Sequence, residues 1–240
     1  MNIRDAATLI LVRDGRILMG QRGEKAAFMP SKFVFPGGAV DPEDFAVPLA
    51  TDIAEPCRSR LTEETRAEMA AALQAAAIRE LWEEAGLILG HRGAWSDTPP
   101  PNWAAFAETG HLPDASAMRF VFRAVTPAGR PRRFDARFFL VDASAISGDP
   151  DDFSRAEDEL SHLRWVPFEE VRALDLPFIT EVVLAEIAPL LLSSDAPASV
   201  PFFRNDDEQH LVSRLGGRSP LSWSGDPLSG RAGAARDPST

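Results

Sequence analysis

Residues 79–87, Arg-Glu-Leu-Trp-Glu-Glu-Ala-Gly-Leu, constrain the fold of this chain more than any other segment. On a helix, Glu80, Glu83 and Glu84 stand at i, i+3 and i+4, so they share one face. The apolar side chains between them fall on the opposite face. We therefore predict a helix over residues 63–85, ended by Gly86, that buries its apolar side and directs its acidic side to solvent.

Three carboxylates on one helix face repel one another, which costs a few tenths of a kcal/mol per pair even in water. One interpretation is a solvated acidic face in which Arg79 pairs with Glu83. The other is a site for a hard divalent cation such as Mg²⁺ or Mn²⁺, whose preferred ligands are carboxylate oxygens. Three glutamates at this spacing leave both interpretations open.

The rest of the chain combines short apolar strands with helical segments. Asp14 and Gly15 form a turn signal between two of the strands, which predicts a hairpin. Strands are predicted at residues 7–12, 16–21, 32–35, 119–126, 134–141 and 163–166, and helices at residues 102–110, 167–173 and 178–192. This order predicts a layered α/β or α+β domain.

Charge and cysteine content argue against several classes of protein. The formal net charge of −11 disfavours nucleic acid as a partner. The single cysteine, Cys57, rules out a disulfide within the chain. The longest apolar stretch, residues 178–192, contains two glutamates and a proline and is too short to span a bilayer. We expect a cytoplasmic protein with no membrane partner, and a homodimer is one open option.

The helix segment resembles the second half of the Nudix box, the signature of the Nudix hydrolases. The first half of that box is a glycine, five residues and an acid, and Gly38 followed by Asp44 fits that shape. The family has seven residues between this acid and the arginine, whereas 34 residues, 45–78, separate Asp44 from Arg79 here. The resemblance therefore implies an insertion, at about residues 45–70, ahead of the helix.

The resemblance implies a Nudix α/β/α sandwich with a mixed sheet as the fold class. It covers residues 7–192, so we expect a Nudix domain over residues 1–203. The Gly-, Ser- and Pro-rich residues 204–240 are expected to form a partly disordered C-terminal tail, above all from Gly216.

The resemblance also implies a metal-dependent diphosphatase. Glu83 and Glu84 are then the first ligands of Mg²⁺ or Mn²⁺, with Glu80 as a third ligand or as the general base, and the Gly38 carbonyl completes the set. Arg79 would orient a glutamate through a charge-assisted hydrogen bond, although an ordinary helix ion pair is the alternative. The role of Asp44 is open because of the long spacing.

Substrate contacts and a second general base are expected outside the box. Glu159 lies six residues before Trp165, and many relatives carry an acid in the corresponding loop; a plain polar loop residue is the alternative. Arg22 ends the second strand, where it could touch substrate or simply face solvent. Arg133, Phe134 and Arg137 form a basic and aromatic cluster that suits phosphate and base recognition, or else belongs to a sheet edge.

This cluster and the interrupted box resemble one branch, the peroxisomal-type coenzyme A diphosphatases. The resemblance implies a small nucleotide substrate, with coenzyme A or an acyl derivative favoured. ADP-ribose or a dinucleotide is the alternative substrate. A non-catalytic nucleotide-sensing Nudix module is the alternative from another class, but such modules often lose box carboxylates that this chain keeps.

Overall fold

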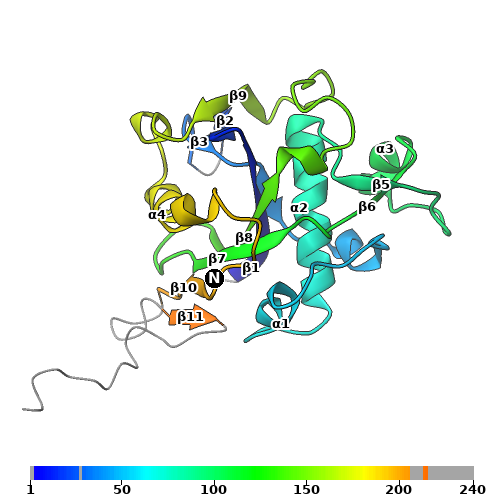
Figure 1. Cartoon of the computed structure of the whole chain (residues 1–240), viewed down its shortest axis with the longest axis horizontal. Helices are drawn as coiled ribbons and strands as arrows, with labels where there is room; N and C mark the ends of the chain where they lie inside the picture. The colour runs from blue at the N-terminus through cyan, green and yellow to red at the C-terminus, as the bar shows by residue number, and fades with distance from the viewer. Residues whose placement is uncertain (1–2, 27–28, 206–212, 216–240) are drawn as a thin grey trace, which may run out of the picture.

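The computed structural model describes residues 3–26, 29–205 and 213–215 of the 240-residue chain. Within these residues, nine strands form one mixed sheet (Figure 1). The strands are β1 Ile3–Arg13, β2 Arg16–Arg22, β3 Phe33–Val34, β4 Gly37–Ala39, β7 Arg119–Val125, β8 Arg133–Asp142, β9 Leu160–Pro167, β10 Val200–Phe203 and β11 Ser213–Leu215.

The strand order is β11-β10-β7-β8-β1-β2-β3, with β4 also paired to β1 and β9 also paired to β2. The pairs β1–β8 and β7–β10 are parallel, and the other pairs are antiparallel. Strands far apart in the chain therefore meet at β1, which contacts β2, β4 and β8. The short strand β4 places a glycine pair beside the centre of the sheet.

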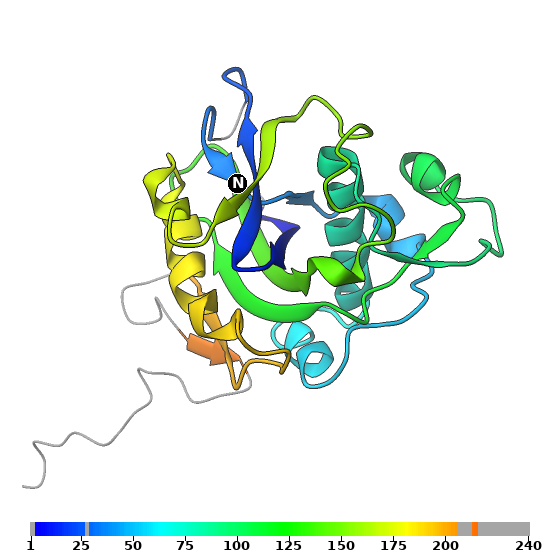
Figure 2. The same ribbon diagram turned by 45° about the horizontal axis from the view of Figure 1, so that its top comes forward.

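The described residues form four α-helices: α1 Cys57–Leu61, α2 Met69–Ala85, α3 Ala104–Ala107 and α4 Phe178–Ile187. Helix α2 covers one face of the sheet and α4 covers the other, and Figure 2 shows the strands lying between them. Strands β5 Gly90–Arg92 and β6 His111–Pro113 pair separately and flank α3. Single 3-10 turns lie at Pro42–Ala46, Pro101–Trp103, Ala143–Ala145, Val171–Ala173 and Ala188–Leu190.

The central strand β1 is buried on both of its faces. Leu9 and Leu11 pack in the core under α2, while Ile10 and Val12 pack in the core under α4. Successive side chains of a strand point to opposite faces, so this run of apolar residues serves two cores at once. The predicted α/β/α arrangement with a mixed sheet is confirmed.

The predicted hairpin and the predicted end of the long helix are also confirmed. Asp14 and Gly15 both adopt positive φ, at 50° and 70°, which matches the twist of the two flanking strands. Gly86 ends α2 in the left-handed conformation with φ 70°, and its amide donates to the Trp82 carbonyl. A residue with a Cβ is strained in that conformation, which explains the glycine.

Several predicted helix limits are wrong. The helix predicted at residues 102–110 is only α3 Ala104–Ala107, and the helix predicted at residues 178–192 ends at Ile187 before the 3-10 turn Ala188–Leu190. The long helix begins at Met69 rather than at residue 63, because Glu64 has a φ of 54° and a helix does not continue through a left-handed residue. The helix predicted at residues 167–173 is only the 3-10 turn Val171–Ala173. Pro167 instead pairs with Arg16 at the end of β9, which keeps the backbone extended there.

Residues 45–70, where we expected an insertion, contain α1 and contribute to the core under α2. Val47, Ile53, Cys57 and Leu61 are buried there. At the other end of the chain, β11 adds a strand to the sheet inside residues 204–240. The expectation of poor order from Gly216 lies outside the described residues. No helix in the described part of the chain is long and apolar enough to cross a bilayer.

Candidate active site

The acidic face of α2 is largely buried, so our expectation that it points to solvent is wrong. Glu84 and Glu80 are only 2% and 9% exposed, and Arg79 is 3% exposed. Glu83 remains partly accessible. The cause is β4, which lies directly against these side chains and which the helix pattern alone does not reveal.

Arg79 holds two of the glutamates and one aspartate. Its Nη1 donates to Glu80 Oε1 at 2.9 Å and to Glu83 Oε2 at 2.8 Å. Its Nε and Nη2 bind the two oxygens of Asp44 at 3.0 and 3.1 Å, and Nη2 also donates to the Ala39 carbonyl. Burial alone would lower the pKa of this guanidinium, but the hydrogen bond to Asp44 and the surrounding carboxylates raise it. Arg79 therefore links Asp44, Glu80 and Glu83, and it stays charged.

Asp44 takes part in the site despite the 34 residues that separate it from Arg79. Its side chain is buried, and the bidentate pair with Arg79 joins the 3-10 turn Pro42–Ala46 to α2. The spacing from Gly38 to Asp44 was the signal for this position. The chain between Asp44 and Arg79 folds so that the two side chains remain in contact.

The glycine pair of β4 allows the close approach of backbone and carboxylates. The Gly37 amide donates to Glu84 Oε2 at 2.8 Å. A Cβ on Gly38 would lie 2.2 Å from Glu80 Oε1, so any larger residue there would force Glu80 or β4 to move. Our sequence interpretation missed the hydrogen bond from Gly37, for which the Pro-Gly-Gly run at residues 36–38 was the only signal.

Burial and mutual repulsion disfavour the charged form of the three glutamates. Burial raises the pKa of Glu80 to about 7 and raises that of Glu83. Burial and the nearby Glu80 charge raise the pKa of Glu84 well above its ordinary value. Glu84 Oε1 is buried and has no hydrogen-bond partner among the described residues. A cation beside these oxygens would satisfy the orphaned atom and offset the repulsion.

Each of the three carboxylates has one oxygen engaged by the protein, Glu80 and Glu83 through Arg79 and Glu84 through Gly37. Within residues 3–26, 29–205 and 213–215, no group of three or more acidic, His or Cys side chains is arranged to hold a metal ion by itself. An open donor set suits Mg²⁺, which usually binds one or two carboxylates and completes its shell with water and substrate phosphates. The residues present therefore fit a divalent cation.

Arg22 and Glu159 come from distant parts of the chain and meet beside this site. Arg22 Nη2 and Glu159 Oε1 lie 2.7 Å apart. The charge of Glu159 raises the pKa values of Glu80 and Glu84, and the charge of Arg22 lowers that of Glu84. Arg22 Nε is buried without a partner in the described part of the chain. The fold thus brings both predicted residues to the carboxylates.

The basic cluster on β8 lies farther along the sheet. Arg137 pairs with Ala7 in the sheet, and Ala7 pairs with Gly38 on its other side. The Arg137 side chain is buried and binds Asp5 at 2.5 Å and the Asp135 carbonyl at 2.7 Å. These contacts are to sheet residues rather than to α2.

Arg133 and Phe134 begin β8 beside the end of β7. Arg133 Nε donates to the Thr126 carbonyl at 3.0 Å, and the Phe134 amide donates to Thr126 Oγ1 at 3.0 Å. Both side chains are half-buried. The structure therefore places this part of the cluster at the β7–β8 connection.

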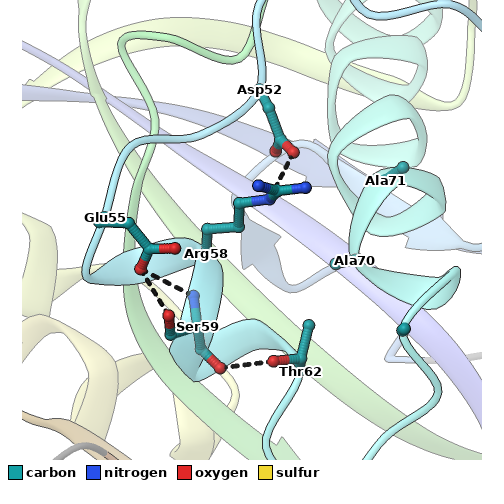
Figure 3. Close-up of a pocket in the computed structure, with 8 residues that line it drawn as sticks. Asp52, Glu55, Arg58, Ser59, Thr62, Ala70 and Ala71 are labelled. Atoms are coloured by element: carbon teal, nitrogen blue, oxygen red, sulfur yellow. Dashed lines mark hydrogen bonds and ion pairs between the residues drawn. The ribbon is translucent and has the colours of Figure 1, made fainter.

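A separate surface hollow lies beside α1 (Figure 3), and its lining includes none of the three glutamates of α2. Its polar groups largely satisfy one another, since Arg58 pairs with Asp52 and Ser59 donates to Glu55. A second hollow lies between the β5–β6 pair and the loop at residues 147–155. Neither contains the glutamates of α2, so the chemistry is assigned to the carboxylates and not to these hollows.

Comparison with known proteins agrees with this geometry. The NUDIX domain family model matches residues 1–187. A putative nudix hydrolase 7 of Caenorhabditis elegans is 28% identical over 70% of this chain and 52% of its own length. The acyl-coenzyme A diphosphatase NUDT19 of Gallus gallus is 26% identical over 63% of this chain and 54% of its own length. The chain thus spans about half the length of these curated relatives.

A solved structure is also similar. A NUDIX hydrolase from Alicyclobacillus acidocaldarius superimposes with a TM-score of 0.61 and 28% sequence identity. The match covers 82% of this chain and 94% of that structure. The overall fold of this chain is therefore shared with a solved NUDIX hydrolase.

Proposed function

Since this chain belongs to the Nudix family, we propose that it hydrolyses the diphosphate linkage of a nucleoside diphosphate derivative in a reaction that depends on a divalent cation. One observation carries the proposal: Arg79 and β4 hold three glutamates together, two of them buried, and Glu84 Oε1 is left without a partner among the described residues. Buried carboxylates arranged in this way are costly unless a cation neutralises them.

Glu80, Glu83 and Glu84, with the Gly38 carbonyl, would hold Mg²⁺ or Mn²⁺. When bound, the cation neutralises the diphosphate and lowers the pKa of a water molecule. Arg79 contributes by orienting Glu80 and Glu83, since one guanidinium group binds both. It is a positioning residue, because its donors are occupied by the protein.

Glu80 and Glu159 are the two candidates for accepting a proton from the attacking water. In the chain without a cation, burial raises the pKa of Glu80 to about 7, the range that suits a general base at neutral pH. Glu159 is more exposed and is paired with Arg22. Arg22 would contact a phosphate of the substrate, because its charge acts on Glu84 and its Nε is buried without a partner in the described part of the chain.

Coenzyme A or an acyl-coenzyme A is the favoured substrate. The similarity to a protein named acyl-coenzyme A diphosphatase supports this choice. Arg133 and Phe134, which are half-buried, would add a phosphate contact and a stacking surface for a base, whereas Arg137 is buried and bound to Asp5 and to the Asp135 carbonyl. ADP-ribose and dinucleotides carry the same diphosphate linkage and are the alternatives that an assay must separate.

The test is hydrolysis with Mg²⁺, and separately with Mn²⁺, of coenzyme A, acetyl-coenzyme A, ADP-ribose, NADH and diadenosine polyphosphates. Chromatography then resolves the products. Release of 3′,5′-ADP from coenzyme A faster than cleavage of the others supports the proposal in full. A preference for ADP-ribose keeps the reaction and replaces the substrate. Absence of metal-dependent turnover on all five, with nucleotide binding retained, favours a sensing module instead.

A further inference from the structure

Trp103 contacts the carboxylate network although it lies outside both halves of the Nudix box. It ends the 3-10 turn Pro101–Trp103, ahead of α3 and between β5 and β6. The side chain is fully buried, and its Nε1 donates a 3.0 Å hydrogen bond to Asp44 Oδ1. The same oxygen accepts from Arg79 Nε at 3.0 Å. A segment that projects beside α2 (Figure 1) therefore reaches the centre of the site.

The indole completes the hydrogen bonding of a buried carboxylate. Asp44 Oδ1 accepts from Trp103 and Arg79, while Oδ2 accepts from Arg79 Nη2 at 3.1 Å and from the Asp41 amide at 2.9 Å. An ionised carboxylate has about four lone-pair sites, so these four donors saturate it. A saturated, buried network holds its members in a single arrangement.

The position of Asp44 sets the position of the glutamates through Arg79. The guanidinium is planar and rigid, so fixing its Nε and Nη2 edge on Asp44 also fixes the direction of Nη1. Nη1 is the nitrogen that binds Glu80 and Glu83. A continuous chain of hydrogen bonds thus runs from the indole to two of the proposed metal ligands.

We infer that Trp103 is a positioning residue of the active site: its indole N–H fixes Asp44, so that Arg79 holds Glu80 and Glu83 in the arrangement that binds the divalent cation. This inference rests on the proposed function. Residues that orient metal ligands from outside the coordination shell typically change metal affinity or activity by ~10- to 100-fold when they are lost.

A purely structural role is the competing explanation, because Trp103 also belongs to an aromatic cluster. Its ring lies 5.3 Å from that of Phe106 and 6.0 Å from that of Trp95. Trp103→Phe keeps an aromatic ring in the cluster and removes the N–H. Trp95→Phe is the matched control, since it removes an indole N–H from the same cluster that donates to the His111 carbonyl and not to Asp44.

The experiment measures Mn²⁺ binding to the full chain without substrate, by electron paramagnetic resonance, alongside metal-dependent turnover. We expect Trp103→Phe to weaken Mn²⁺ binding by ~10-fold. Trp95→Phe should stay within about twofold of the unmodified chain. Equal binding by both variants and the unmodified chain overturns the inference. If the unmodified chain still turns over substrate, only the inference about Trp103 fails and the proposed function is kept. If the unmodified chain turns over none of the substrates, the proposed function itself fails.

A double-mutant cycle separates coupling through Asp44 from a loss of packing. In an Asp44→Asn background the acceptor carboxylate is already changed, so Trp103→Phe should have much less effect on Mn²⁺ affinity than it has alone. An undiminished effect in that background overturns the inference.

A measurement on the unmodified sequence covers the case in which Trp103→Phe does not fold. The indole N–H resonance of Trp103 can be assigned by elimination from Phe variants of the other tryptophans. It should shift on addition of Mg²⁺, while that of Trp95 should not. A Trp103 resonance that does not shift when Mg²⁺ is added overturns the inference.

Discussion

Gly37 and Glu84 are joined by a 2.8 Å hydrogen bond from the glycine amide to Glu84 Oε2, across 47 positions of sequence. This contact docks the carboxylate helix on β4 and fixes one of the two oxygens of Glu84. The other oxygen, Oε1, is buried and without a partner in the described part of the chain. One carboxylate thus combines a structural attachment with a free, desolvated ligand atom.

Replacing Glu84 by Gln should therefore separate fold from chemistry. The amide keeps the shape of the side chain but removes the charge, so we expect turnover to fall by at least ~100-fold, as for loss of a group that stabilises charge in the transition state. The melting temperature should stay the same or rise, because an unpaired buried charge has been removed. Turnover assays with Mg²⁺ and thermal denaturation measure the two effects.

Glu83→Gln is expected to behave similarly, and Glu169→Gln, on an exposed surface position, is the control that should leave turnover unchanged. Full activity in both the Glu83 and the Glu84 variants would remove these residues from the proposed metal site.

Without a divalent cation, the stability of the protein should fall as pH rises through the weakly acidic range. The pKa of Glu80 is about 7 in the folded chain and 4.5 ordinarily, so the folded state binds the extra proton between these values. The free energy of unfolding should therefore decrease from about pH 4.5 to about pH 7, by up to ~3 kcal/mol from this residue. Urea unfolding in EDTA at a series of pH values measures the slope.

Two controls identify the source of that slope. Glu80→Gln should reduce it, with the remainder coming from Glu83 and Glu84, whose pKa values burial also raises. Saturating Mg²⁺ should restore stability near pH 7 because the cation binds the folded state. An identical slope in the Glu80 variant would assign the pH dependence to other groups.

Adding a methyl group at Gly38 should disturb both the fold and the site. The new Cβ would lie 2.2 Å from Glu80 Oε1, so either β4 or the glutamate must move. We expect Gly38→Ala to cost ~1–3 kcal/mol of stability, the usual range for overpacking, and to weaken Mn²⁺ binding. Gly23→Ala is the matched control, since nothing lies within 4 Å of its Cβ position. Equal melting temperatures for the two variants would show that the structure accommodates the added methyl group without loss of stability.

Two truncations should locate the end of the folded unit. Ending the chain after Leu215 keeps every described strand, so melting temperature and turnover should remain close to those of the full chain. Ending it after Asn205 removes β11 and the buried Leu215 side chain, which pairs with Val200. Losing one buried leucine costs ~2 kcal/mol, which lowers the melting temperature by roughly 5 °C in a chain of this size. Differential scanning calorimetry compares both with the full chain, and equal melting temperatures would contradict a stabilising role for β11.

Local sequence patterns were sufficient for several elements. Asp14 and Gly15 predicted a hairpin because a two-residue turn needs positive φ at both positions, which Asp and Gly tolerate better than most residues. Gly86 predicted a helix end because glycine adopts the left-handed conformation without strain. The spacing of the three glutamates predicted that they share one face. These features depend on neighbours within one turn of helix or one hairpin, and such neighbours are visible in the sequence.

Tertiary structure alone decided what that acidic face meets. Burial of Glu80 and Glu84 depends on β4, the Asp44–Arg79 pair bridges 35 positions, and Trp103 reaches Asp44 from 59 positions away. Long-range contacts of this kind follow from how the sheet orders its strands and not from local periodicity. The sequence by itself therefore determined which side chains we propose as cation ligands. The fold determined that Glu80 and Glu84 are buried, and that Arg79 holds Glu80 and Glu83 while Gly37 holds Glu84.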